Sequence, residues 1–187
     1  MKKTSTLVIV LLSSLISLSS FSQSSKSSGS GTTNPMQIGS LFLNAGLGFG
    51  AGYKNPTYAT PWGFKIAAEY GMWQAGPGVI TLGAELGSTF SGENFNGNSY
   101  HSSTFVVAGR AAWHYGWNIP GLDTYGGFSA GIGFNHYTNE GVDYNSPVPA
   151  LGAFAGASYF VTPTFGFNSE FGYDITNFQI GVVFKLD

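Results

Sequence analysis

Six ionisable residues stand within stretches of the chain that alternate between apolar and other side chains. Three are acids and three are bases, so they could pair as opposite charges: Lys65, Glu69, Glu85, Arg110, Glu170 and Lys185. Successive side chains of a strand point to opposite faces, and all six fall on the face opposite the large apolar side chains. Random placement gives this result about once in 64 cases. We therefore predict a shared, charge-paired interior in which Glu85 contacts Arg110, with Lys65 and Glu170 forming a second layer.

A second group places an imidazole and a hydroxyl close together, as in an activated nucleophile: His136 and Thr138, just before the polar residues that begin at Glu140. The segment Phe134-Asn-His-Tyr-Thr-Asn-Glu140 resembles the His-x-Ser-Asn motif of lipid A deacylases, a resemblance that implies His136 as the base. Thr138 replaces the serine with a more hindered hydroxyl, and no acid that would orient His136 is identifiable. We predict no catalytic residue and interpret the segment as a strand end with interfacial side chains.

Metal and cofactor chemistry has little support in the sequence. There is no cysteine, which excludes thiolate metal ligands and cysteine nucleophiles. His101 and His114 are far apart in the chain and lack metal-ligand spacing. The net charge of −2 argues against an electrostatic nucleic-acid binder. We predict no metal, no cofactor and no nucleic-acid partner.

The composition identifies the kind of element that must position the six charges. Charged residues make up only 9% of the 187 residues, against about 25% in soluble domains. Aromatic residues reach 16%, yet no stretch after the amino-terminal segment approaches the roughly 20 apolar residues of a membrane-spanning helix. The remaining structure that satisfies its backbone inside a membrane is the closed β-barrel.

A period of two dominates from Ser40 onward and divides the chain into eight candidate strands. Their approximate ranges are 41–51, 62–72, 79–90, 103–115, 124–136, 150–161, 164–173 and 177–186. The alternative is a soluble, lipocalin-like barrel with an apolar interior. That barrel would need charges scattered over its outer face, and the chain has too few of them. We predict an all-β fold, an eight-stranded antiparallel transmembrane β-barrel with an amino-terminal signal peptide.

The amino terminus reads as an export signal. Lys2 and Lys3 precede an apolar run from Leu7 to Leu18, and Ser20-Phe-Ser22 supplies the small residues of a cleavage site. We predict a signal peptide over 1–22, a flexible Ser/Gly-rich linker over 23–39 and the barrel over 40–187.

Connections between the strands alternate in length, as expected for short periplasmic turns and longer external loops. The residues 54–61, 91–102 and 137–149 are predicted as polar external loops, and 174–177 as a short external connection. Together they are net acidic, with Glu93, Glu140, Asp143 and Asp174 against Lys54. Aromatic residues near the strand ends predict two interfacial girdles. The residues assigned to the girdles are Trp62, Trp73, Trp113, Trp117, Tyr173 and Phe184.

Three segments resemble small OmpX/OmpA-like barrels of the porin family: 123–128, 156–173 and 180–184. The chain departs from them by continuing past Phe184, where such barrels often end on an aromatic residue read by the assembly machinery. The resemblance implies a protein of the Gram-negative outer membrane that contacts lipid, including lipopolysaccharide, and the barrel-assembly machinery.

The same resemblance implies a structural, adhesion or envelope-complex role, with other envelope proteins as possible partners. An eight-stranded barrel is narrow enough for side chains to fill it. The alternatives kept open are a lipid A-modifying hydrolase and a narrow channel for small solutes.

Overall fold

The computed structural model describes residues 34–186 except positions 52, 54–59, 96–97 and 140–141. The predicted signal peptide and most of the predicted linker lie outside the described residues. No helix among the described residues is long and apolar enough to cross a membrane.

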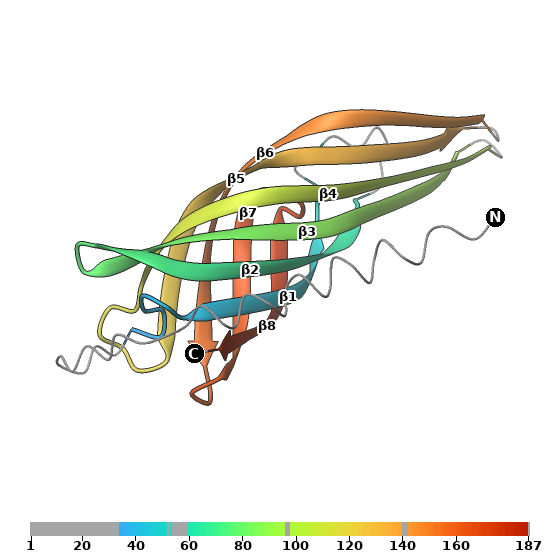
Figure 1. Cartoon of the computed structure of the whole chain (residues 1–187). Coiled ribbons are helices and arrows are strands. Elements are labelled where there is room, and N and C mark those ends of the chain that lie inside the picture. The colour runs from blue at the N-terminus through green and yellow to red at the C-terminus, as the bar shows by residue number, and fades with distance from the viewer. Residues whose placement is uncertain (1–33, 52, 54–59, 96–97, 140–141, 187) are drawn as a thin grey trace, which may run out of the picture. The chain divides into compact units, whose positions relative to one another are not determined.

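Eight strands pair antiparallel in chain order, and β8 closes the ring by pairing with β1 (Figure 1). The strands are β1 Leu41–Phe49, β2 Trp62–Ala75, β3 Gly78–Phe95, β4 Asn98–Tyr115, β5 Leu122–Asn139, β6 Val142–Phe160, β7 Phe165–Tyr173 and β8 Phe178–Leu186. The all-β, eight-stranded antiparallel prediction is confirmed.

The strands β3 to β6 are about twice as long as β1, β7 and β8. Much of the sequence predicted as external loops, 91–102 and 137–149, is strand, so that prediction is wrong. Paired residues continue outward through Ser91↔Ser102 and Tyr137↔Tyr144. The polar side chains there do not prevent pairing, because the ladder is made by backbone groups.

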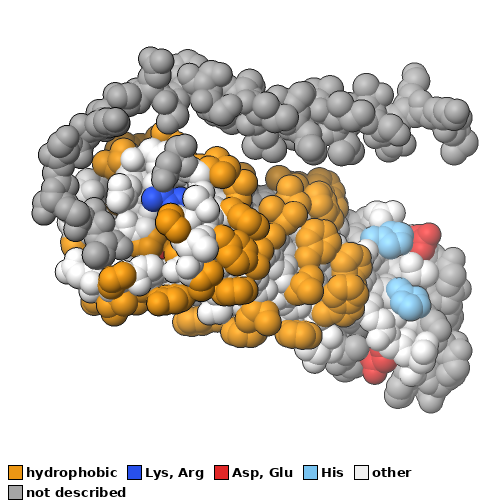
Figure 2. Space-filling view, turned by 90° about the horizontal axis from the view of Figure 1, so that it is seen from below, with side chains coloured by type: hydrophobic (Ala, Val, Ile, Leu, Met, Phe, Trp, Pro, Cys, Tyr) orange, Lys and Arg blue, Asp and Glu red, His pale blue; other side chains and the backbone are white. Residues whose placement is uncertain are grey.

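The faces of the barrel are reversed relative to a soluble protein. Along β2, Lys65 and Glu69 are 1% and 0% exposed, whereas Trp62 and Ile66 are 55% and 47% exposed. Figure 2 shows hydrophobic side chains covering the wall as a belt that stops short of one end, where polar side chains gather. The exterior is therefore apolar where the interior is charged.

Side chains fill the interior in layers. One apolar cluster, at the end where the chain enters β1, contains Met36, Phe42, Val79, Phe160 and Val183. Another, farther along the strands, contains Tyr53, Val106, Ala108, Ala150 and Ile175. The buried charges lie between these two clusters in the register of the strands.

Residues 34–39, the last part of the predicted linker, contact the barrel. Met36 is 1% exposed, and the Asn34 side chain donates to the Pro77 carbonyl and accepts from the Gly116 N–H. The Gly39 N–H donates to the Gly71 carbonyl. These contacts fix the entry to β1.

Candidate functional site: a buried charge network and exposed hairpin ends

Arg110 of β4 lies at the centre of the buried charges. Its Nη1 is 2.9 Å from Glu85 Oε2, and its Nη2 is 2.9 Å from both Glu69 Oε1 and Glu170 Oε2. The guanidinium carbon lies 3.9 Å from the centroid of the Phe154 ring, which adds a cation–π contact. One cation thereby joins carboxylates from β2, β3 and β7.

Lys65 of β2 forms the neighbouring layer. Its ammonium contacts Glu170 Oε1, lies 2.6 Å from Asp174 Oδ2 and 3.8 Å from Glu85 Oε2. The sequence analysis put Glu85 against Arg110 and Lys65 against Glu170, and the structure places both pairs in contact.

Asp174 was predicted in an external loop and lies instead inside the barrel, 1% exposed. The connection between β7 and β8 folds inward, so Asp174 Oδ1 also accepts from Tyr53 Oη at 3.2 Å and Ser129 Oγ at 3.1 Å. Burial alone would raise the pKa of Asp174, but the Lys65 ammonium outweighs it and holds the pKa of this carboxyl below its usual value. Burial also holds the pKa of the Tyr53 phenol above its ordinary value.

His114 of β4 extends the network toward the chain-entry end. Its Nε2 is 2.9 Å from Glu69 Oε2 and its Nδ1 is 2.8 Å from Asp123 Oδ2. Thr81 Oγ1 donates to the same Glu69 oxygen at 2.8 Å, and the ring stacks on Tyr125 at 5.0 Å between centroids. A period of two puts His114 on the same face as Arg110, four residues before it, but nothing in its spacing pointed to Asp123, 9 residues away across a turn.

The network is acidic, not balanced as predicted. Five carboxyl groups, those of Glu69, Glu85, Asp123, Glu170 and Asp174, contact the three bases Lys65, Arg110 and His114. Lys185 lies elsewhere, half-buried near the end of β8. There it lines a cavity of about 360 Å³ with Pro35, Gly121 and Phe160.

The chemistry of the network is that of internal cross-linking. Buried charges are tolerated when each meets an opposite charge with good hydrogen-bonding geometry. The charges belong to five strands and one connection, so the network ties opposite walls of the ring together. Among the described residues, no cluster of three or more His, Cys, Asp or Glu could hold a metal ion.

The six aromatic residues assigned to the girdles are all exposed, from 38% at Trp113 to 57% at Tyr173. Trp73, Trp113, Trp117 and Phe184 lie at or just beyond the strand ends on the side of the β2–β3 turn, and Trp62 and Tyr173 lie at the other end. Tyr115 contacts both Trp113 and Trp117, and Trp113 Nε1 donates to the Ala75 carbonyl at 3.0 Å.

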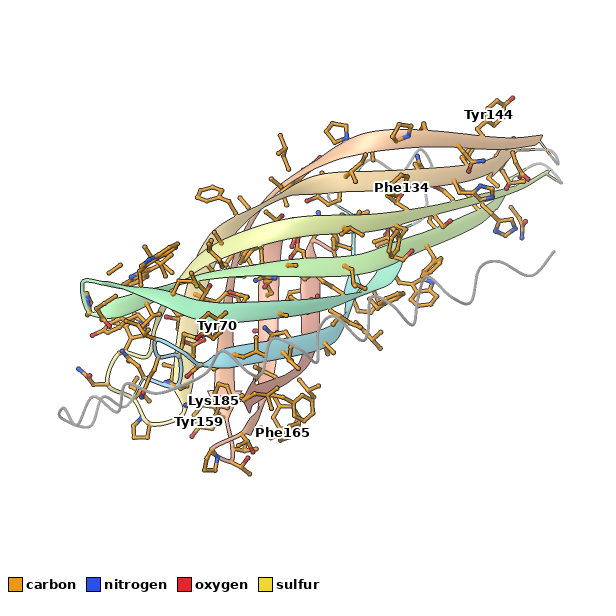
Figure 3. The ribbon with its side chains drawn as sticks, in the orientation of Figure 1. Tyr70, Phe134, Tyr144, Tyr159, Phe165 and Lys185 are labelled. Atoms are coloured by element: carbon orange, nitrogen blue, oxygen red, sulfur yellow. The ribbon has the colours of Figure 1, made fainter. Side chains whose placement is uncertain are left out.

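The described outer part of the β5–β6 hairpin carries polar, exposed side chains. Figure 3 shows Tyr144 near the far end of β6 and Lys185 at the opposite end of the barrel. His136 is 48% exposed, with its Nδ1 2.7 Å from Asn145 Oδ1 and its Nε2 3.8 Å from Asp143 Oδ1.

The arrangement around His136 does not match a catalytic triad. Thr138 Oγ1 donates to Asp143 Oδ1 at 2.8 Å and lies 3.5 Å from His136 Nε2. In a triad the acid orients the histidine from the ring nitrogen remote from the hydroxyl. Here Asn145 takes that position and Asp143 binds the hydroxyl. Glu140 lies outside the described residues.

Comparisons with known proteins define the fold. Neither a protein-family model nor a curated protein matches the chain. Among solved structures, Ail, the attachment invasion locus protein of Yersinia pestis, is 15% identical with a TM-score of 0.55, and the match covers 80% of this chain and 100% of Ail. Ail in complex with the heparin analogue sucrose octasulfate gives a TM-score of 0.54 at the same identity and coverage.

Neisserial surface protein A is also similar, at 13% identity and a TM-score of 0.47, over 79% of this chain and 94% of its own. At these identities the similarity concerns the fold, and the two Ail structures carry it. The chain has the fold of the small OmpA/OmpX-like outer-membrane barrels.

Proposed function

We propose that the chain is an integral outer-membrane protein of a Gram-negative bacterium, exported by its amino-terminal signal. Its lumen is closed by side chains, and its role is structural or in interaction through the ends of its long hairpins. The observation that carries the proposal is the reversed wall: ionisable side chains inside, and large apolar side chains outside. The lipid partners are those of that membrane, lipopolysaccharide included, and the assembly machinery acts during insertion.

The dimensions of the wall support this location. Nine residues, the length of β1, β7 and β8, span about 30 Å along a strand. A strand tilt of about 40° reduces this to about 23 Å along the barrel axis. An apolar belt of about 25 Å is what an outer-membrane barrel presents to lipid. Tyr173 ends β7 and Phe184 lies near the opposite end of the wall in β8, and such aromatic positions suit the two headgroup layers.

The experiment compares two substitutions on the same face of β5. Phe128, 73% exposed in the middle of the belt, is changed to Arg, and His136, eight residues farther out, is changed to Arg as the matched control. An arginine facing lipid near the midplane costs about 2–4 kcal/mol, and one near the interface costs little. We expect Phe128→Arg to lower the yield of heat-modifiable barrel in outer-membrane fractions and His136→Arg to leave it unchanged. Equal yields of both variants would contradict a lipid-facing wall.

The filled interior favours a closed barrel over a channel. The charge network spans the lumen, and the apolar clusters lie on both sides of it. We therefore expect no stepwise conductance in planar bilayers. Regular conductance steps from purified protein would favour the channel alternative.

The hydrolase alternative has a separate test. Because Asp143 binds the Thr138 hydroxyl and does not orient His136, we expect the acyl chains of lipid A to be the same with and without the protein. Mass spectra of extracted lipid A decide the matter. Loss of an acyl chain that disappears with His136→Ala would overturn the non-enzymatic proposal.

We expect a partner at the outer ends of this chain to differ in charge from the ligand in the Ail complex. Sucrose octasulfate is a dense polyanion, and sulfates are bound by Lys and Arg. The described residues in the outer ends of β3–β4 and β5–β6, 88–104 and 132–149, contain no Lys and no Arg. They carry Glu93 and Asp143, so a neutral or cationic partner is the better candidate for an adhesion role.

A further inference from the structure

Among the described residues, the β6 strand has one long side without a strand partner. It pairs with β5 over its whole length, from Val142 to Tyr159, but with β7 only from Ala153 onward, because β7 ends at Tyr173. Over the described residues, the stretch from Val142 to Gly152 therefore has a strand neighbour on one side only. Figure 1 shows β5 and β6 continuing well beyond the end of β7.

Such an edge is open to strand addition. An exposed edge strand presents a row of N–H and C=O groups to which another extended chain can pair. The residues from Asp143 to Pro147 are all exposed, as are Pro149 and Leu151. The edge is long, accessible and carries a single charge, at Asp143, so its geometry alone would favour pairing with another chain.

Two prolines interrupt this edge. Pro147 pairs with Phe134 and Pro149 with Ile132, inside an unbroken register with β5. In an antiparallel ladder, alternate residues direct both backbone groups to one neighbour, and proline is tolerated where its nitrogen faces away from the pairing partner. The nitrogens of both prolines therefore face the unpaired side. Asn145 and Leu151 direct their backbone N–H and C=O groups to the same side.

We propose that Pro147 and Pro149 keep the free edge of β6 from pairing with the β6 edge of a second copy of this chain. The edge is self-complementary when two copies meet antiparallel about position 147. In that pairing position 147 faces itself and position 145 faces position 149. The prolines remove both hydrogen bonds at the centre and one at each adjacent pair. The double interruption leaves only the outer pairs, at 143 and 151, complete.

The test restores the donors. The double variant Pro147→Thr and Pro149→Thr is compared with the parent in detergent micelles, where two copies can meet in any orientation. Leu151→Thr is the matched control, because it changes an outward side chain on the same edge without adding a donor. We expect the affinity for self-association of the double variant to rise about tenfold or more by sedimentation, since each restored hydrogen bond adds to pairing. We expect the affinity for self-association of Leu151→Thr to equal that of the parent.

A cysteine reports the register. The chain has no native cysteine, so Pro147→Cys with Pro149→Thr introduces a single thiol at the predicted centre. Facing Cα atoms of a bonded antiparallel pair are about 5.5 Å apart, within the range of a disulfide. We expect oxidised dimers that depend on Pro149→Thr. Adding Leu151→Pro to the threonine double variant should restore the monomer, because it removes an edge donor again.

Several outcomes overturn the proposal. These are a monomeric double variant, a parent that dimerises equally well, association of Leu151→Thr, or dimers of the double variant that persist with Leu151→Pro. Heat-modifiable migration of every variant shows that its barrel is folded, so that a loss of fold is not mistaken for a change in association.

Discussion

Two histidines show how the interior of this barrel differs from its outer hairpin ends. His114 is buried, with a carboxylate within 3 Å of each ring nitrogen. His136 is about half exposed, with an amide oxygen near one nitrogen and the Asp143 carboxylate 3.8 Å from the other. The first histidine is fixed by Glu69, 45 residues away on β2, and by Asp123 across the next turn, whereas both partners of the second lie on the other strand of its own hairpin.

This difference shows in which part of the protein polar contacts contribute to its stability. In the lumen, water does not hydrate a charge that has lost its partner. Removing one charged side chain therefore destabilises the whole network. At the hairpin ends water replaces any lost partner, and exposed pairs contribute little. The interior therefore determines stability, and the ends are free to serve contacts with other molecules.

The largest effect is expected at Arg110. Arg110→Met removes the cation that joins Glu69, Glu85 and Glu170 and leaves three carboxylates close together. We expect a loss of about 3–5 kcal/mol in the free energy of unfolding, measured by urea titration in micelles. Arg110→Lys keeps the charge but not the planar fork and should lose less. An Arg110→Met barrel as stable as the parent would show that the interior does not depend on this network.

His114 comes next. His114→Ala leaves the buried carboxyls of Glu69 and Asp123 without the imidazole, with an expected loss of about 2–3 kcal/mol in the free energy of unfolding. The same urea titration measures it. Because Asp123→Asn removes the second carboxylate, it should reduce the cost of His114→Ala in a double-mutant cycle; additive effects would contradict the contact.

Acid should weaken the contact between Lys65 and the inward connection. The folded-state pKa of Asp174 is lowered below its unfolded value, mainly by Lys65 against the opposing effect of burial. Its contribution to stability is therefore present above the ordinary aspartate pKa of about 4 and is lost as pH falls through the lowered value.

We expect the difference in unfolding free energy between the parent and Asp174→Asn, about 1–2 kcal/mol at pH 7, to shrink as the pH is lowered below 4. Urea titrations at several pH values measure it. A difference that grows with acidity would have the wrong sign for a lowered pKa.

The smallest effect is expected at the hairpin end. His136→Ala removes contacts that are exposed to water, so the free energy of unfolding should change by no more than about 0.5 kcal/mol. This variant is the direct counterpart of His114→Ala. If both variants lost equal stability, the contrast between interior and hairpin ends would not hold.

Particular residues show how far the sequence could be interpreted. The parity of the charges placed Lys65, Glu69, Glu85, Arg110 and Glu170 on the inner face, where the structure has them. Whether a residue is at an odd or even position of its strand gives its face but not its position along the barrel axis. Lys185 lies on the inner face near the end of β8, apart from the network. The turn composition around Asp174 resembled any polar loop, so its inward fold could not be predicted.

The sequence by itself determined the strands and the reversed wall, because a period of two assigns each side chain to a face and the shortage of charge requires an apolar outside. Only the closed ring decided that Asp174 joins the network, since Lys65 and Asp174 are 109 residues apart and meet because the connection between β7 and β8 folds into the lumen. It also decided the length of the hairpins, because backbone pairing continues through polar residues that carry no apolar pattern. The free edge of β6, interrupted by Pro147 and Pro149, follows from that same extension of β6 beyond β7.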